Sequence, residues 1–345
     1  MNLLNVAKKA GVSTATVSRV INDKSLVNPE TKEKVLRVIK ELNYQPNLHA
    51  RNLKYLQYKR KEPKKNFNIG CILFSDFKYS DPYFSRILDG IDREIINQNY
   101  NLLFTYTINQ LKASPNLLIN KINEQNIDGV LVIGYIDKDI YSDIKQRIRN
   151  IVVIDADMHD ETDCVVMNKF EAVRKLVIKL HDAGHRRIAF IGDCIDPEER
   201  FLGYKAGIED AGLPYDKNLV EWEPGKWSRE NGYKYMKKIL ERTKSTDDGP
   251  PTAVFGACDT IALGIMHALK EQGLRIPEDV SVVGYDDIYE SEYSSPPLTT
   301  LKVDKEELGA MGVRRLIEKI NNPGLPTMKT ILTVELVIRK SCIIT

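Results

Sequence analysis

The sequence has little of what an exported protein, a membrane protein or a metalloprotein needs. Five cysteines stand at positions 71, 164, 194, 258 and 342, and they form neither a C-x-x-C pair nor a metal-ligand spacing. Their odd number also argues against a disulfide framework. No segment approaches 18 consecutive apolar residues, and the N-terminal MNLLNVAKK has no signal-type apolar run. These absences predict a cytoplasmic protein without a bound metal.

Catalytic motifs are also missing. The patterns G-x-S-x-G, G-x-x-x-x-G-K-[ST], H-E-x-x-H and G-x-G-x-x-G after a strand do not occur, and the five histidines are scattered. An enzyme would need a nucleophile with its base, a phosphate loop or a metal set. The sequence therefore predicts no enzymatic activity, no catalytic residue and no cofactor.

Negative charge is scarce in the first part of the chain. Residues 1–65 carry 15 Lys and Arg against 5 Asp and Glu, whereas the remainder carries 35 against 43. The near-neutral total of +2 thus hides a basic head and an acidic body. Attraction to DNA phosphates with counterion release requires such asymmetry. A solvated charge run is the simpler interpretation of KRKEPKK, residues 59–65, which we take as a linker.

The N-terminus carries a helix–turn–helix pattern, VAKKAGVSTATVSRVIND, over residues 6–23. Gly11 supplies the left-handed turn that ends a first helix, and Ser13 caps a second helix over about 14–22. Asn28-Pro29-Glu30 opens a third helix. Apolar side chains at helical spacing are expected to form the core between them. They are Val6, Ala7, Ala10, Val17, Val20, Ile21, Val35, Leu36, Ile39 and Leu42.

The second helix has a face of small polar residues that suits the major groove of DNA. Arg19 can read guanine edges, the Ala15 methyl can meet a thymine methyl, and short hydroxyls reach bases or phosphates. The predicted DNA-binding residues here are Ser13, Thr14, Ala15, Thr16, Ser18, Arg19 and Asn22. The alternative is a surface helix pair without nucleic acid, which explains amphipathicity but not the joint occurrence of turn glycine, caps and reading face.

The segment VAKKAGVSTATVSRVIN, followed by Tyr-x-Pro-Asn-x-x-Ala-Arg-x-Leu over residues 44–53, resembles the lac-repressor (LacI/GalR) family of bacterial regulators. The likeness continues in PTAVFGACDTIALG, IPEDVSVVGYDD and PPLTTLKVD, which begin at positions 251, 276 and 296. It implies that Thr14, Ala15 and Arg19 read bases. It also implies that Leu53 wedges into the minor groove from a short hinge helix. The Asp-Pro-Tyr-Phe run at 81–84 resembles the galactoside and oligosaccharide branch.

The hinge segment is at most two helical turns, residues 47–54, which is too short to persist alone in water. We expect it to fold when two copies meet in the groove, where Leu53 would partly unstack a base step. Arg51 and Lys54 are predicted to bind DNA beside it. The alternative for Leu53 is packing on the body. His49 replaces the small apolar residue usual in the family, so hinge pairing would be weaker or sensitive to pH.

Apolar runs alternate with helical stretches from residue 67 onward, which predicts an α/β body of parallel sheets covered on both faces. Two such units resemble the bilobed periplasmic-binding-protein fold of type I. We predict a helix–turn–helix domain over 1–46, hinge and linker over 47–66, and an effector-binding and dimerisation body over 67–345. The expected lobes are 67–163 plus 293–325 and 164–292 plus 326–345.

Ligands of such folds lie in the cleft at the carboxyl ends of the strands. Carboxylates and an arginine there can bind paired hydroxyls, and an indole can stack on a pyranose. The predicted effector-binding residues are Asp76, Asp81, Tyr83, Phe84, Asp155, Arg200, Trp227, Cys258 and Asp286. Simpler interpretations are that Phe84 is core, and that Asp259 and Asp287 cap the segments after them. Many sugar-responsive relatives have asparagine in place of Cys258.

The sequence thus predicts a repressor that binds a pseudo-palindromic operator as a homodimer and is released by a small sugar. The alternative is a regulator of the same family whose DNA binding is strengthened by a corepressor, a purine or a phosphoprotein. A solute receptor for transport would share the body, but it would need a signal peptide and would lack the basic head. Because no heptad tail follows VELVIRKSCIIT at 334–345, a dimer is expected rather than a tetramer.

Overall fold

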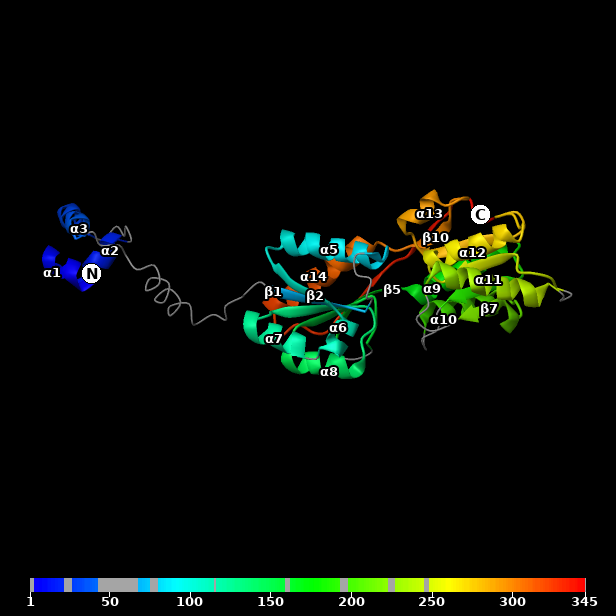
Figure 1. Cartoon of the computed structure of the whole chain (residues 1–345), viewed down its shortest axis with the longest axis horizontal. Coiled ribbons are helices and arrows are strands. Elements are labelled where there is room, and N and C mark those ends of the chain that lie inside the picture. The colour runs from blue at the N-terminus through cyan, green and yellow to red at the C-terminus, as the bar shows by residue number, and fades with distance from the viewer. Residues whose placement is uncertain are drawn as a thin grey trace. The chain divides into compact units, whose positions relative to one another are not determined.

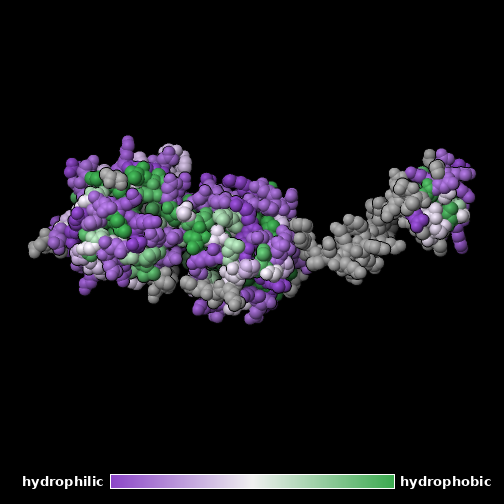
Figure 2. All heavy atoms as spheres, turned by 180° about the vertical axis from the view of Figure 1, so that it is seen from behind, coloured by the Kyte–Doolittle hydropathy of each residue, from purple (hydrophilic) through white to green (hydrophobic). Residues whose placement is uncertain are grey.

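The computed structural model describes residues 3–21, 27–42, 68–74, 80–114, 116–158, 162–192, 198–222, 227–244 and 248–344. The chain divides into two compact units, Met1–Lys65 and Asn66–Thr345, called here the head and the body. No helix among these described ranges is long and apolar enough to cross a membrane. The surface of the body is mainly hydrophilic and is interrupted by patches of hydrophobic residues (Figure 2).

Three helices form the head: α1 (Leu3–Ala10), α2 (Thr14–Ile21) and α3 (Pro29–Glu41). The predicted turn and caps are confirmed. Gly11 has φ +66°, the Thr16 amide donates to Ser13 Oγ at 3.1 Å, and the Glu30 amide donates to Asn28 Oδ1 at 3.0 Å. The core between the helices is made of Val6, Ala7, Ala10, Val17, Val20, Val35 and Val38, with Val12, Val27, Ile39 and Leu42 at its border.

The prediction that Leu36 closes this core is wrong. Its side chain is 46% exposed, whereas Val38 is buried in its place. The buried stripe of α3 runs through Val35, Val38 and Leu42, at intervals of three and four residues. Leu36 lies one residue, about 100°, away from Val35 around the helix, so it faces solvent.

The body contains two six-stranded sheets, one in each lobe (Figure 1). The first lobe has the strand order β11-β5-β4-β3-β1-β2, and all its pairs are parallel. Its strands are β1 (Asn68–Leu73), β2 (Asn101–Thr107), β3 (Gly129–Ile133), β4 (Ile151–Ile154), β5 (Asp163–Met167) and β11 (Lys329–Leu332). Its helices are α5 (Phe84–Asn97), α6 (Ile108–Ala113), α7 (Asn116–Gln125), α8 (Lys138–Arg147) and α14 (Lys305–Asn321).

The second lobe has the strand order β12-β10-β9-β8-β6-β7, with only the β10–β12 pair antiparallel. Its strands are β6 (Ile188–Gly192), β7 (Val220–Trp222), β8 (Ala253–Gly256), β9 (Ser281–Asp286), β10 (Thr299–Lys302) and β12 (Glu335–Val337). Its helices are α9 (Lys169–Asp182), α10 (Glu199–Asp210), the 3₁₀ helix Lys217–Leu219, α11 (Arg229–Thr243), α12 (Asp259–Glu271) and α13 (Tyr289–Tyr293).

Helices cover both faces of these sheets, which explains why strands such as β3 are buried along their whole length. In the first lobe α14 packs against α5, although the two are far apart in sequence (Figure 1). Glycines permit this close approach. A Cβ on Gly90 would lie 2.0 Å from the Glu306 carbonyl oxygen, and one on Gly309 would lie 2.3 Å from that of Ile87.

The chain crosses between the lobes at positions that differ from the predicted ones. It leaves the first lobe after β5 at Met167, returns after β10 at Lys302, and crosses again between β11 and β12, after Leu332. The predicted crossings followed residues 163, 292 and 325. The apolar patterns of β5 and β10 suit either sheet, and only their pairing with β4 and β9 assigns them. A residue pattern alone does not contain that information.

A buried carboxylate ties the returning segment to the first lobe. Asp163, fully buried at the start of β5, accepts a hydrogen bond from Arg315 Nε at 2.6 Å and pairs with Lys319. It also accepts the Met328 amide at 3.0 Å, just before β11. Burial raises the pKa of this carboxyl group, but the bonds from Lys319 and Arg315 outweigh that effect and lower it overall.

We predict that Asp163→Asn lowers the free energy of unfolding by about 3–5 kcal/mol, because it leaves two cations facing a neutral amide in a buried site. Urea denaturation at pH 7 measures this. The matched control is Asp143→Asn, whose partner Arg147 and own side chain are 38% and 46% exposed. It should change stability by less than about 0.5 kcal/mol. Because the folded pKa is lowered, the contribution of Asp163 is present above about pH 4 and is lost as the pH falls further. Equal losses of unfolding free energy in Asp163→Asn and Asp143→Asn would contradict this role of the buried Asp163.

Candidate functional site

The predicted reading helix presents a short exposed face. The side chains of Thr14 and Arg19 are exposed on α2, whereas Val17 and Val20 are buried against the other helices. Ser13 Oγ lies 2.9 Å from the Thr16 hydroxyl and accepts the Thr16 amide, so this pair caps the helix. Among the described side chains of α2, Arg19 and Thr14 are exposed, and no hydrogen bond of this cap involves them.

Several predicted site residues lie outside the described residues. They are Asn22, the hinge residues His49, Arg51, Leu53 and Lys54, and Asp76 after β1. The side chains of Ala15 and Ser18 on α2 are likewise not described. Their assignment rests on the sequence alone.

In the body, predicted effector residues from both lobes come together where strands end. Asp155 follows β4 of the first lobe, Asp286 ends β9 of the second, and Cys258 follows β8. Burial raises the pKa of the Tyr83 hydroxyl well above its usual value, and the charges of Asp155 and Asp286 raise it further. One tyrosine of the first lobe is thus close to carboxyl groups from both lobes. We call these residues, with Arg200, the interlobe cluster.

Arg200 is the cation of this cluster. Its Nε donates to Glu198 Oε1 at 2.7 Å, and a terminal nitrogen donates to the Ala257 carbonyl oxygen at 2.8 Å. Burial lowers its pKa, but the charges of Glu198 and Asp286 more than compensate and raise it. The guanidinium carbon lies 4.4 Å from the ring centre of Trp227. Trp227, predicted to stack on a sugar, therefore has one ring face in contact with Arg200.

The acceptors of the cluster are strongly shielded from water. Asp286 is 8% exposed, and burial together with the charge of nearby Asp259 raises its pKa well above the usual value. Tyr285 is fully buried, and its hydroxyl has no hydrogen-bond partner within the described part of the chain. Buried polar groups of native proteins are normally paired, so this hydroxyl needs a partner that the described residues do not supply. Burial raises the pKa of Cys258, which keeps it a neutral thiol.

Other predicted residues have structural partners. Asp81 accepts the amides of Tyr83 and Phe84 at 2.9 and 3.1 Å, which positions Tyr83 at the start of α5. Phe84 packs against the core of the body. Asp287 pairs with Arg339 at 2.7 Å.

Asp259 does not cap its own helix, contrary to the interpretation from sequence. It accepts bonds from the Thr300 and Ser291 hydroxyls and from the Ile288 amide. Burial raises its pKa to about 6 against the effect of these bonds.

Sequence reasoning missed four contributors to the cluster: Lys169, Glu198, Tyr285 and Lys305. Glu198 could have been noticed, because it lies two residues before Arg200. Tyr285 was hidden inside an apolar strand, and nothing local distinguishes the two lysines from solvated ones.

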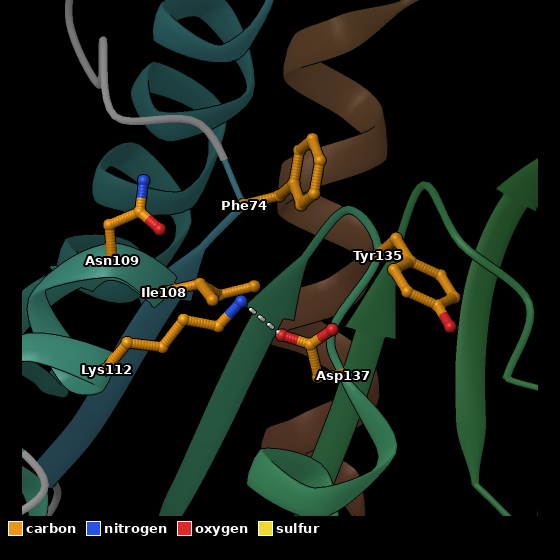
Figure 3. Close-up of a pocket in the computed structure, with 6 residues that line it drawn as sticks. All are labelled: Phe74, Ile108, Asn109, Lys112, Tyr135 and Asp137. Atoms are coloured by element: carbon orange, nitrogen blue, oxygen red, sulfur yellow. Dashed lines mark ion pairs between the residues drawn. The ribbon is translucent and has the colours of Figure 1, made fainter. Parts of the chain in front are cut away.

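The first lobe also has a shallow hollow of ≈ 200 Å³ at the carboxyl ends of β1, β2 and β3. Its lining is Phe74, Ile108, Asn109, Lys112, Tyr135 and Asp137, none of which was predicted (Figure 3). Lys112 Nζ and Asp137 Oδ2 are 2.7 Å apart across it. The hollow lies at the part of the sheet formed by β3, β1 and β2, whereas Asp155 follows the neighbouring strand β4.

Comparison with known proteins agrees with this architecture. The model of bacterial regulatory proteins of the lacI family matches residues 2–47, and that of the periplasmic binding protein-like domain matches residues 177–342. An HTH-type transcriptional repressor PurR of Pasteurella multocida (strain Pm70) is 35% identical over 343 residues, which cover 98% of this chain and 97% of that protein. The PurR of Mannheimia succiniciproducens is 33% identical over 98% and 97%.

Solved structures of regulators match this chain over both the head and the body. The regulator CelR in complex with cellobiose is 27% identical, has a TM-score of 0.71, and is matched over 99% of both chains. The lac repressor dimer bound to operator and the anti-inducer ONPF is 28% identical with a TM-score of 0.70, over 99% of this chain and 98% of that one. These relatives are regulators and not enzymes. The chain therefore belongs to the lacI family of bacterial regulatory proteins and is a DNA-binding transcriptional repressor.

Proposed function

We propose that this repressor binds a pseudo-palindromic operator as a homodimer in the cytoplasm, and that a small sugar bound in the interlobe cluster weakens operator binding. The observation that carries the proposal is the cluster itself. It joins carboxyl groups of both lobes and a half-buried arginine at strand ends. The head of the same chain has an exposed arginine on its reading helix.

The head would read one half-site through α2, with Thr14, Ala15 and Arg19 at base edges. Bases or the phosphate backbone of DNA would be contacted by the hydroxyls of Ser13, Thr16 and Ser18 and by the side chains of Asn22, Arg51 and Lys54. Few reading side chains are available, so Leu53 would add selectivity by kinking a deformable step. Two-fold symmetry of the dimer would match that of the operator.

A sugar suits the donors and acceptors of the cluster. Asp155 and Asp286 need hydrogen-bond donors, whereas Arg200 supplies donors and the Tyr285 hydroxyl can do either. Each sugar hydroxyl both donates and accepts, so adjacent hydroxyls could serve a carboxylate and the guanidinium together. Tyr83, Trp227 and Cys258 would shape the site, and Asp76, Asp81 and Phe84 would border it. Two solved relatives carry cellobiose or ribose.

A purine acting as corepressor is the second candidate. The observation in its favour is that the curated relatives at 33–35% identity over 97% of their length are repressors named PurR. The two candidates predict opposite effects on operator affinity, because an inducer lowers this affinity and a corepressor raises it. A thermal-shift panel of cellobiose, ribose, hypoxanthine and guanine separates them, since a bound ligand raises the melting temperature. Stabilisation by the purines alone would reject the sugar.

Ligand binding would act on the head through the lobes. A ligand held by residues of both lobes favours one arrangement of them, and the hinge segments of the two protomers pair only in the arrangement that suits DNA. Coupling free energies of this kind are typically about 1–3 kcal/mol. A fuller release from the operator would require a larger difference in ligand affinity between the two arrangements.

We predict that Arg200→Lys keeps operator affinity but loses the ligand response, because lysine retains the charge and lacks the planar fork. Titrations of operator DNA, followed by fluorescence anisotropy with and without the ligand found in the panel, measure this. In Arg200→Lys, the operator affinity measured with ligand should stay within about twofold of the affinity measured without it. Arg229→Lys, on an exposed arginine near Trp227, is the matched control and should respond normally. A normal response in Arg200→Lys would remove Arg200 from the site.

We predict that Arg19→Ala costs about 1–3 kcal/mol of operator affinity and relaxes preference at one base pair of each half-site. A gel-shift titration against the selected operator and its single-base variants tests this. Arg37→Ala, an exposed arginine on α3, should alter affinity similarly for all sequences or not at all. Normal binding and normal base preference in Arg19→Ala would show that α2 is not the reading helix.

A further inference from the structure

Two lysines, Lys305 buried and Lys169 half-buried, occupy matched positions where the chain crosses between the lobes. Lys169 is the first residue of α9, and Lys305 is the first residue of α14. Each follows a capping residue, Asn168 or Asp304, whose side chain accepts the amide of a glutamate three residues later. Each helix is also the first element after a crossing strand, β5 or β10. The same local motif therefore occurs at two of the crossings, and we call the pair the interlobe lysines.

Lys305 reaches from the first lobe to the second. Its helix packs against α5, β3 and β4, yet its ammonium group donates to the carbonyl oxygens of Asp286 and Asp287 at the end of β9. The third donor goes to the Val303 carbonyl oxygen at 3.2 Å. The residue is 6% exposed. An ammonium group has three donors, so all of them are used, and all by backbone carbonyls.

Lys169 makes the corresponding contact in the opposite direction. Its helix packs against α10 in the second lobe, whereas its ammonium group binds Asp155 at the end of β4 in the first. It donates to the Asp155 carbonyl oxygen at 3.1 Å and lies 2.7 Å from the carboxylate Oδ1. The two side chains are 15% and 11% exposed. Each lobe thus supplies a lysine to the cluster aspartate of the other.

The aspartates that these lysines hold have an uncommon backbone conformation. Among the described residues, five that are not glycine have positive φ: Asn99, Asn126, Asp155, Asp286 and Asp287. The three aspartates, at 67°, 110° and 53°, are the ones bound by the interlobe lysines. Such conformations cost free energy in residues with a Cβ and persist only where the surroundings enforce them. The lysine–carbonyl bonds reach these peptides directly. They act together with bonds from the Asp155 amide to the Val165 carbonyl oxygen at 2.9 Å and from the Asp287 amide to Thr300 Oγ1 at 3.4 Å.

We propose that Lys169 and Lys305 are positioning residues that hold the backbone of Asp155, Asp286 and the adjoining Asp287 in this conformation and so set the direction of the cluster carboxylates. Since each lysine starts a helix of the opposite lobe, a rotation of the lobes shifts the lysine and redirects the carboxylate. The lysines would thereby transmit the arrangement of the lobes to the ligand site. This last step rests on the proposed function, whereas the hold on the backbone does not.

A cycle of variants tests the hold without any ligand. In the full chain, Lys305→Met should lower the melting temperature by several degrees, whereas Lys302→Met, on an exposed lysine at the end of β10, should not. In an Asp287→Gly background, glycine adopts the positive φ without strain. The decrease in melting temperature caused by Lys305→Met should therefore fall to less than half of its size in the wild-type background. If Lys305→Met does not fold alone, recovery of folded protein by Asp287→Gly is the supporting result. Equal losses in both backgrounds, or no recovery, would overturn the proposal.

Ligand affinity tests the second step. Calorimetric titrations with cellobiose and with hypoxanthine should show affinity for the binding probe reduced by about tenfold or more in Lys169→Met and Lys305→Met, because misplaced carboxylates bind poorly. Lys302→Met and the exposed Lys179→Met are the controls and should bind as wild type does. Unchanged affinity in both lysine variants would contradict a positioning role. If the wild type binds neither probe, cellobiose and hypoxanthine are rejected as its ligands, and the variant cycle still decides whether the lysines hold the aspartates.

Discussion

The body depends on one constraint: a charge removed from water must find its partner within the protein. Asp163 meets this constraint with Arg315, 152 residues further along the chain. Arg200 meets it with Glu198 and the Ala257 carbonyl. The interlobe lysines meet it with carbonyls of the other lobe. These bonds join segments that no local pattern connects, so buried charge specifies how the crossing segments are arranged.

The same constraint explains where a ligand can act. In the interlobe cluster Asp286 and Cys258 are buried, and the buried Tyr285 hydroxyl beside them has no partner among the described residues. A hydroxylated ligand would complete a network that the protein leaves incomplete, and it would do so with groups from both lobes. The described part of the head has its own small apolar core, and side chains cap the starts of α2 and α3. In the proposed function, control of DNA binding passes through the arrangement of the lobes.

The sequence predicted the parts of this structure that local rules determine. The caps at Ser13 and Asn28 follow from side-chain chemistry, and the parallel sheets follow from uninterrupted apolar strands. Leu36 was misplaced by one helical position, because apolar character alone does not say which face is buried. The crossings were misplaced because β5 and β10 fit either sheet. The sequence placed Arg200, Asp155, Asp286, Tyr83 and Cys258 together because strand ends converge, and their role in binding an effector stays a prediction. The interlobe lysines were not predicted, because only tertiary structure places them next to the backbone of the aspartates.

The central claim is that occupancy of the interlobe cluster and operator binding are thermodynamically coupled. Calorimetric titration of the ligand into the free repressor and into its operator complex tests this directly, since coupling between two sites must be reciprocal. A sugar inducer should bind the operator complex more weakly than the free protein, by about 5–150-fold. Equal affinity in the two titrations would contradict the account.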